Sequence, residues 1–292
     1  MVTLHNDFLT VTASPAGAEL TSVKNNLTGV EYLWQADPKV WKRHAPVLFP
    51  IVGKLQNDAY TFEGKTYHMT QHGFARDREF DVLAQSETQV SFVLRDDDET
   101  RAMYPFAFEL VITYTLDNNL VHVDYQVTNP DTKQVMYFAI GAHPGFNIPV
   151  TDDTEFTDYY MSFEPKKSRV QIPLVAGKGI DYAHRTLAAT DVNQALNHEF
   201  FKDDAVIYEL NGRTKFSIVS DKTKHGVSLS VSDAPFMGVW SPYPTTGDFV
   251  CIEPWWGIAD TIEHKGDFTD KLGINTLEPG AQITHSYSIS IF

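Results

Sequence analysis

One short segment near the C-terminus, Cys251 to Asp260, combines a carboxylate with flat aromatic side chains. It reads CIEPWWGIAD and places Glu253 after an apolar run and directly before a proline and two tryptophans. We expect this acid at the end of a buried strand, where lost hydration raises the pKa of a carboxyl group and can poise it as a base. Indole faces are also surfaces on which sugar rings stack. The alternative is a carboxylate held by backbone N–H groups at the strand end, and the segment alone does not decide between the two.

A histidine in a second segment is a candidate partner for this acid. His143 lies in IGAHPGFNIP, with Gly141 before it and Pro144 and Gly145 after it. Glycine and proline on both sides indicate a sharp strand end, which can hold an imidazole rigidly at the mouth of a cleft. We favour this functional role over the alternative of a turn histidine hydrogen-bonded to the backbone.

Further basic side chains are candidates for ligand binding. His72 lies in QHGFARDREF, close to Arg76 and Arg78, and Arg43 precedes the apolar run of RHAPVLFPIVGKL. An arginine next to an apolar run usually pairs with an anion, a cluster of hydroxyl groups or an acidic side chain. The alternative is a structural salt bridge, which for Arg76 and Arg78 fits the sequence as well as ligand binding does.

Other kinds of catalytic site lack their signatures in this sequence. It contains no His-x-His, His-Glu-x-x-His or Cys-x-x-Cys pattern, so no metal site is expected, and only one assembled from residues far apart in the sequence stays open. It also lacks a Gly-x-Ser-x-Gly elbow and a glycine-rich phosphate loop. The single cysteine, Cys251, lies in an apolar run and is interpreted as a small buried hydrophobe. The remaining set of one carboxylate, one histidine, arginines and aromatic side chains suits acid–base chemistry on a neutral polyol.

The elements that must position these residues are β-strands, because apolar residues recur with a period of two. Phe108 to Leu116 alternates in this way, and Val121 to Val127 does so again after the turn Asp117 to Asn119, which predicts a β-hairpin. Further short strands are predicted at Phe8–Ala13, Glu19–Lys24, Asp81–Gln85, Val90–Leu94, Val135–Ile140, Val206–Tyr208, Phe216–Val219, Val227–Val231 and Tyr287–Ile291.

Helical patterns are scarce along the chain. The best candidate is Asp191–Leu196, with Asp191 as the N-cap, and the acidic runs Asp96–Glu99 and Thr151–Asp158 are interpreted as solvated loops. Strands and helices do not alternate, which argues against a parallel sheet. We therefore predict an all-β fold, a large antiparallel sandwich or barrel with very little helix, in a single domain over residues 1–292.

The composition excludes several classes of partner. A formal charge of −15 argues against binding to nucleic acid and to anionic membrane surfaces. The N-terminus lacks the pattern of a signal peptide, and no apolar run approaches the roughly twenty residues of a membrane helix. One cysteine permits no intramolecular disulfide, so a soluble cytoplasmic protein is expected. The exposed strand edges of a sandwich leave both a monomer and a homodimer open.

Four motifs taken together resemble the aldose 1-epimerase (galactose mutarotase-like) family. They run in order along nearly the whole chain as Arg43…Pro46…Phe49-Pro50…Gly53, His72-Gly73-Phe74-Ala75-Arg76, Gly141-x-His143-Pro144-x-Phe146 and Glu253-Pro254-Trp255-x-Gly257. They are also similar to a divergent bacterial branch that includes hexose-6-phosphate 1-epimerase-like proteins.

The resemblance implies a β-supersandwich, no cofactor, and interconversion of the α and β anomers of a free aldose. It assigns Glu253 as the base that takes the proton from the C1 hydroxyl group and His143 as the acid that protonates the ring oxygen. His72 and Arg43 match positions that hold the sugar, and Trp240 matches an aromatic position that lines the cleft. Such an acid–base pair predicts a bell-shaped dependence of the rate on pH.

Three hypotheses follow for the substrate and the role. The first is an epimerase acting on an unphosphorylated hexose. The second keeps the reaction but moves it to a hexose 6-phosphate, with Arg43 and Arg76 holding the phosphate; the acidic net charge mildly disfavours it. The third is a non-catalytic carbohydrate-binding or regulatory protein, against which the presence of both Glu253 and His143 argues.

Overall fold

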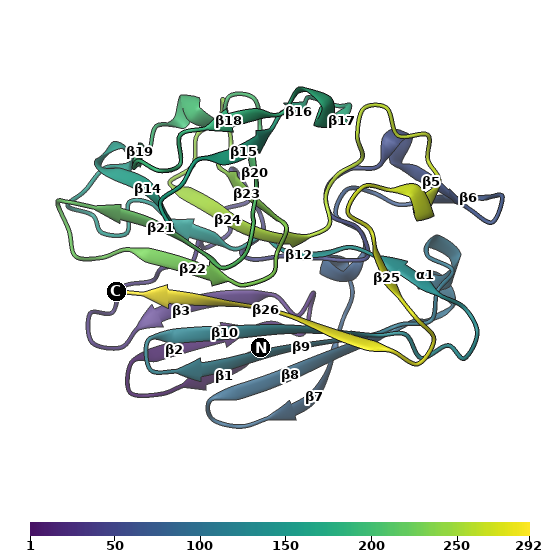
Figure 1. Cartoon of the computed structure of the whole chain (residues 1–292). Helices are drawn as coiled ribbons and strands as arrows, with labels where there is room; N and C mark the ends of the chain where they lie inside the picture. Colours follow the sequence, from purple (N-terminus) through teal and green to yellow (C-terminus); the bar gives the residue numbers. More distant parts are fainter.

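A computed structural model describes all residues from Met1 to Phe292 and confirms the predicted antiparallel all-β fold. Its largest sheet has nine strands, in the order β19 (Gln194–Ala195), β14 (Tyr159–Glu164), β21 (Thr214–Ser220), β22 (Val227–Val231), β26 (Gln282–Ile291), β10 (Leu120–Thr128), β9 (Glu109–Asp117), β8 (Gln89–Arg95) and β7 (Asp81–Gln85). Figure 1 shows the C-terminal strand β26 running between β22 and β10, so that it joins the two halves of this sheet.

A second sheet has eight strands and carries the segments singled out for their chemistry. Seven of them follow the order β18 (Thr186–Ala188), β15 (Arg169–Ile172), β20 (Val206–Glu209), β23 (Phe236–Trp240), β24 (Phe249–Trp256), β12 (Ile140–Ala142) and β4 (Val47–Leu48). The eighth, β13 (Gly145–Asn147), also pairs with β24.

Smaller sheets and short helices complete the fold. One sheet joins β1 (Val2–His5), β2 (Leu9–Ala13) and β3 (Leu20–Asn25); the strand pairs are β5 (Ala59–Phe62) with β6 (Lys65–His68), β11 (Met136–Phe138) with β25 (Asn275–Leu277), and β16 (Leu174–Val175) with β17 (Gly179–Ile180). The helices are α1 (Asp98–Met103) and the 3-10 turns η1 (Gln56–Asp58), η2 (Ala75–Asp77), η3 (Phe156–Asp158), η4 (Tyr182–His184), η5 (His198–Phe201) and η6 (Phe268–Asp270). None of the helices is long and apolar enough to cross a membrane.

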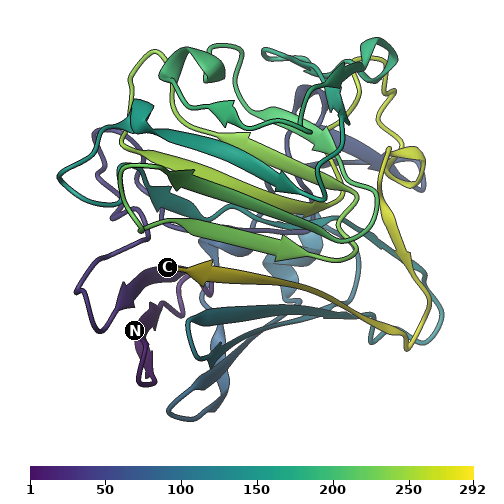
Figure 2. The ribbon, with the colours of Figure 1, turned by 60° about the vertical axis from the view of Figure 1, so that its left-hand side comes forward.

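The core consists of two clusters of buried apolar residues, one of 67 that extends from Val2 to Ile291 and one of 10 around Trp255 and Ile258. In β10 the side chains alternate between buried and half-buried positions, as the two-residue period predicts. Buried apolar side chains from both large sheets pack together in this core. The C-terminus lies at the end of β26, and the N-terminus lies at the start of β1 (Figures 1 and 2).

The hairpin with the strongest sequence signal is confirmed. Leu120 pairs with Asp117, so Asn118 and Asn119 form its two-residue turn. Asn118 has a left-handed φ of 52°, which asparagine adopts more readily than other residues with a β-carbon.

The predicted helix at Asp191–Leu196 is wrong. Gln194 and Ala195 form β19 and pair with Met161 and Tyr160 of β14. A six-residue helix is costly to nucleate, whereas pairing with an existing strand supplies backbone hydrogen bonds at once.

Two acidic runs are more structured than the solvated loops predicted for them. Helix α1 begins in the first run, where the Asp97 side chain accepts the backbone N–H of Thr100 and the Thr100 hydroxyl accepts that of Asp97. This reciprocal capping satisfies two N–H groups at the helix start. In the second run, η3 buries Phe156.

The predicted strand Val135–Ile140 is divided into β11 and β12. The break occurs at Ala139, whose N–H donates to the carbonyl oxygen of Pro50 at 2.7 Å. Because of this break β11 pairs with β25, while β12 pairs with β4 and β24.

Candidate active site

Three strands of the eight-stranded sheet bring the two candidate catalytic side chains together. β12 and β13 both pair with β24, with Gly141 opposite Trp255 and Gly145 opposite Cys251. His143 lies in the gap between β12 and β13. The interruption coincides with the sharp strand end that glycine and proline predict, and it directs the imidazole toward β24.

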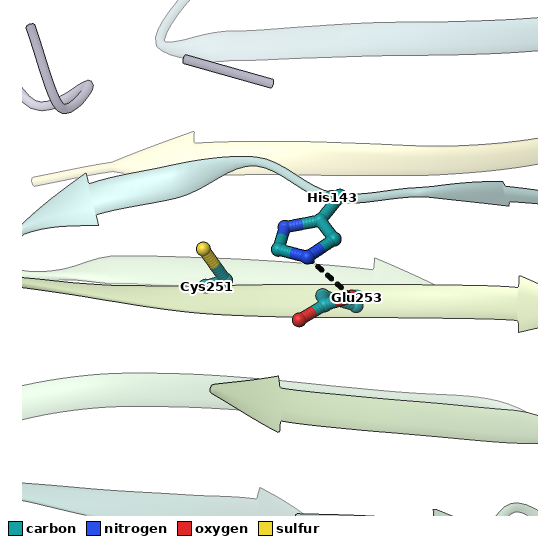
Figure 3. A group of neighbouring side chains, drawn as sticks. All are labelled: His143, Cys251 and Glu253. Atoms are coloured by element: carbon teal, nitrogen blue, oxygen red, sulfur yellow. Dashed lines mark ion pairs between the residues drawn. The ribbon is translucent and has the colours of Figure 1, made fainter. Parts of the chain in front are cut away.

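β24 presents Glu253 from its interior, which corrects the position at a strand end expected from the sequence. Successive side chains of a strand point to opposite faces of the sheet. Val250 and Ile252 belong to the main core cluster. Cys251 and Glu253 therefore point to the other face, where Figure 3 shows them beside the imidazole.

The imidazole and the carboxylate face each other directly. His143 Nε2 lies 3.2 Å from Glu253 Oε2 (Figure 3), and the two residues are 8% and 1% exposed. The remaining polar atoms, Nδ1 of His143 and Oε1 of Glu253, are buried without a hydrogen-bond partner. Backbone groups therefore do not satisfy either side chain. Buried polar atoms without partners are rare, and a catalytic role is one of the explanations for them.

The electrostatic environment shifts the pKa values of the two side chains in opposite directions. Burial raises the pKa of Glu253 well above its usual value, the negative charge of Asp204 adds to this, and the Trp255 indole N–H opposes it. Burial lowers the pKa of His143 to about 3, and the positive charge of Arg76 acts in the same direction. The coupled pair consequently holds a single proton over a wide range of pH.

Glycine in the neighbouring strand makes room beside the acid. Gly238 of β23 pairs with Glu253, and a β-carbon at Gly238 would lie 2.5 Å from Cζ2 of Trp255. The Trp255 ring thus occupies the space that a side chain at this position would take. Its Nε1 is also buried without a partner.

His72 approaches the pair from the segment after β6 in a strained conformation. Its φ of 69° lies in the left-handed region, which residues with a β-carbon rarely adopt and which clusters at functional sites. Its Nδ1 accepts the backbone N–H of Gly53 at 3.1 Å, so the neutral ring carries its proton on Nε2. The ring stands edge-on to His143, with centroids 5.6 Å apart. Burial lowers the pKa of His72, which keeps the ring neutral.

A cavity of about 490 Å³ opens onto these side chains. Of the residues predicted for the site, the cavity brings together Glu253, His143, His72, Arg76 and Trp240. Its wall is completed by Trp41, Pro46, Gly53, Lys54, Gln71, Leu174, Val175, Ala176, Gly177, Gly179, Asp204, Ala205, Ile207, Trp255 and Ala259. It is thus an open cleft with aromatic faces, hydrogen-bonding groups and one imidazole–carboxylate pair.

Arg43 is the predicted site residue that does not line this cavity. Its guanidinium donates to Asp77 at 2.8 Å and to the backbone carbonyl of Arg76 at 3.4 Å. Arg76 donates to the carbonyl oxygen of Gln71 at 2.6 Å, while its Nε is buried without a partner. Arg43 therefore supports the segment that carries Arg76, and Arg76 itself faces the ligand space.

Two residues of the cavity wall were missed by the sequence reasoning. Trp41 stacks on His143, with ring centroids 5.1 Å apart and planes inclined by 30°. The sequence pattern that could have identified it is an aromatic residue two positions before Arg43. Asp204 precedes β20 and lines the cavity with a carboxylate. The sequence pattern that could have identified Asp204 is a pair of acidic residues shortly before an apolar strand.

Comparison with known proteins agrees with the motifs. The family described as aldose 1-epimerase matches residues 1–290. Protein LacX of Lactococcus lactis subsp. lactis is 32% identical over 298 residues, covering 99% of this chain and 99% of that protein.

Two solved structures share the fold over the whole chain. A galactose mutarotase related enzyme from Lactobacillus acidophilus is 46% identical with a TM-score of 0.97, covering 100% of this chain and 97% of that one. A galactose mutarotase-like protein from Lactobacillus casei is 33% identical with a TM-score of 0.91, covering 100% of both chains. These matches confirm the resemblance expected from the four motifs: the chain belongs to the aldose 1-epimerase family.

Proposed function

We propose that this protein is an aldose 1-epimerase that interconverts the α and β anomers of a free hexose. The observation that carries the proposal is the buried contact between His143 and Glu253 at 3.2 Å, open to a cavity with aromatic walls. Family membership supports a sugar substrate. The assignment of the sugar and of the catalytic roles is our own.

The reaction needs a base at the C1 hydroxyl group and an acid at the ring oxygen, two atoms that are bonded to the same carbon. Glu253 takes the proton of the C1 hydroxyl group while His143 gives a proton to the ring oxygen, so the bond from C1 to the ring oxygen breaks and an aldehyde forms. Rotation about C1–C2 presents the other face of the aldehyde. The ring oxygen then attacks C1, its proton returns to His143, and the C1 oxygen takes a proton from Glu253. Each well-placed proton donor or acceptor contributes about 10²–10⁴ to such a rate.

The pair must enter the reaction in its ionised form, with the shared proton on His143. Burial favours the neutral form, so neighbouring groups have to stabilise the charges. The Trp41 ring stacked on His143 favours an imidazolium, because an aromatic face attracts a cation. The buried indole N–H of Trp255 and the hydroxyl group of the sugar favour the Glu253 carboxylate.

The ion pairing of Arg43 favours a neutral hexose over a hexose 6-phosphate. A phosphate clamp of Arg43 and Arg76 would need two free guanidinium groups, yet Arg43 is paired with Asp77. Among the other charged groups that line the space, Asp204 would repel a phosphate, whereas Arg76 and Lys54 would attract one.

Saturation-transfer NMR on the full chain tests the function. Glucose and galactose are expected to exchange between anomers faster than in buffer alone, and their 6-phosphates much more slowly. Faster exchange of the 6-phosphates would instead support the phosphate-specific alternative. Sugar binding without any exchange, measured by calorimetry on the same samples, would identify a carbohydrate-binding protein and overturn the enzymatic proposal.

Replacing Trp41 by leucine is expected to lower kcat by roughly 2–30-fold, since a cation–π contact contributes about 0.5–2 kcal/mol. The loss arises because the imidazolium form of His143 becomes harder to populate. Trp41→Phe keeps an aromatic face and is expected to retain most of the activity. If both variants changed only KM, Trp41 would contact the sugar without acting on His143.

The rate is expected to show a broad bell-shaped dependence on pH. At low pH the pair takes up a second proton and the base is lost; this limb lies below the ordinary His value because burial lowers the pKa of His143. At high pH the shared proton is lost and no acid remains; this limb lies well above the ordinary carboxyl value because burial and Asp204 raise the pKa of Glu253. Cys251, Arg76 and His72 are the other titratable groups facing the pair.

Asp204→Asn tests this assignment of the limbs. Removing the negative charge is expected to shift the alkaline limb of kcat/KM to lower pH, with a smaller effect on the acid limb. An alkaline limb that stays in place would show that Asp204 does not act on the pair.

A further inference from the structure

A third side chain beside the catalytic pair has no part in the proposed proton transfers. Cys251 lies two residues before Glu253 on β24, so both project from the same face of the strand. Cys251, His143 and Glu253 each offer one potential metal-ligand atom, and these three atoms lie within 4.8 Å of one another. Figure 3 shows the thiol and the carboxylate beside the imidazole. The interpretation of Cys251 as buried is confirmed, at 0% exposure, but its place among polar ligands is unlike that of a core residue.

The three groups form a donor set that suits a soft divalent cation. Thiolate, imidazole and carboxylate are the side-chain ligands of zinc sites, whereas magnesium and calcium prefer oxygen alone. Two of the polar atoms, His143 Nδ1 and Glu253 Oε1, are buried without a hydrogen-bond partner. A metal held by Glu253 Oε1 would satisfy one of these atoms, whereas the imidazole ligand would be Nε2 of His143, which faces the same carboxyl group.

The spacing requires only a small contraction. Ligand atoms of a tetrahedral zinc site lie about 3.3–3.8 Å apart for bonds of about 2.0–2.3 Å. The contact of 3.2 Å between His143 and Glu253 is already near this value. The two distances from the sulfur of Cys251 are at most 4.8 Å, so the three side chains need to contract by about 1 Å or less around the metal. The cavity, which His143 and Glu253 line, supplies an entry path and room for a water molecule as the fourth ligand.

We propose that Cys251, His143 and Glu253 form a binding site for Zn²⁺ or a similarly soft divalent cation, and that its occupation switches off the acid–base pair. On binding, the thiol releases its proton to solvent and the sulfur bonds to the metal, with no change of oxidation state. Glu253 and His143 then use as ligands the same lone pairs that the epimerase reaction requires. Inhibition rests on the proposed function, whereas metal binding does not.

Cobalt and zinc titrations of the full chain test the site without any need for activity. Because Cys251 is the only cysteine, a sulfur-to-cobalt charge-transfer band can come from no other residue. We expect one equivalent of Co²⁺ to produce this band and Zn²⁺ to abolish it by displacement. Zn²⁺ affinity, measured by competition with a chromophoric chelator, should fall at least about tenfold in Cys251→Ala, since even outer-shell partners of a metal contribute about 10–100-fold.

Two controls separate this site from adventitious binding and from misfolding. His184 pairs with Asp181 at the surface, with Nδ1 and Oδ2 2.8 Å apart, and is an alternative metal ligand. The variant His184→Ala should leave the Zn²⁺ affinity unchanged. Cys251→Ala should keep the thermal unfolding transition and the basal anomerisation rate while losing sensitivity to Zn²⁺.

The outcomes distinguish the site from the proposed function. Absence of the charge-transfer band, or equal Zn²⁺ affinity of wild type and Cys251→Ala, would overturn the metal site. If zinc binding depends on Cys251 but the protein does not catalyse anomerisation, the metal site would be supported and the proposed function would be overturned. Equal inhibition of both proteins by Zn²⁺ would show that the metal acts elsewhere.

Discussion

Glu253→Gln is expected to lower the anomerisation rate by about 10²–10⁴-fold, because an amide cannot accept the proton of the C1 hydroxyl group. The side chain keeps its size, so the cavity and the contact with His143 remain. Saturation-transfer NMR with the sugar that wild type turns over fastest measures the loss. His143→Asn should give a loss of similar order, and the double variant should lose little more, since acid and base act as one unit.

The same substitution is expected to make the protein more stable at neutral pH. Burial raises the pKa of Glu253 in the folded state, so ionising this carboxyl group disfavours folding once the pH exceeds the unfolded value. Glutamine carries no such penalty. The stability gained by Glu253→Gln should therefore be small below the usual carboxyl pKa and should grow as the pH rises above it. Urea unfolding at acidic and at alkaline pH measures this difference.

An exposed acid provides the matched control for this stability effect. Glu87 is 70% exposed in its side chain and pairs with His5 at the surface. Glu87→Gln should leave the anomerisation rate unchanged. It should also leave unchanged the difference between the free energies of unfolding at acidic and at alkaline pH. If Glu253→Gln kept full activity, or were less stable than wild type at alkaline pH, Glu253 would not be the buried base proposed here.

The strand pattern of the sequence determined much of the fold and the core of the site. Alternation of apolar residues identifies the β9–β10 hairpin because both strands have one solvated face. β24 lacks this alternation, since all eight of its residues are buried. Its apolar run suggested a strand that ends before Glu253, and only the pairing of β24 with β12, β13 and β23 shows that it continues through the acid.

Residues that reach the site from distant loops could not be found in the same way. Trp41 and Asp204 join the cavity only through tertiary contacts, and neither carries a local pattern that marks a ligand. Arg43 shows the reverse case. Its motif matches the family, yet the nearby Asp77 takes up its charge and draws the guanidinium away from the cavity wall.

The wall of the cavity also depends on a buried ion pair that periodicity does not reveal. Lys271 and Asp260 are each 1% exposed in their side chains, and Lys271 Nζ lies 2.9 Å from Asp260 Oδ1. Asp260 accepts the backbone N–H of Gln56 through its side chain and that of Ile180 through its carbonyl oxygen. The pair thus connects the segment after β24 to two other segments, which contribute Lys54 and Gly179 to the cavity.

Lys271→Met is expected to lower the free energy of unfolding by about 3–5 kcal/mol, because it leaves a buried carboxylate without its counter-ion. The double variant Asp260→Asn with Lys271→Met should recover much of this loss, since no uncompensated charge remains. Urea denaturation measures the three free energies. KM for the sugar should rise in the single variant, as the walls of the cavity lose their common anchor.

A surface pair shows whether burial is the cause of that effect. Lys215 and Glu164 lie 3.4 Å apart with 43% and 62% of their side chains exposed. Lys215→Met should change the free energy of unfolding by about 1 kcal/mol or less, because water screens exposed ion pairs. A loss of similar size in Lys215→Met and Lys271→Met would contradict the argument, as would a double variant no more stable than Lys271→Met alone. The expected contrast would show that this chain tolerates two buried charges beside its cavity because each neutralises the other.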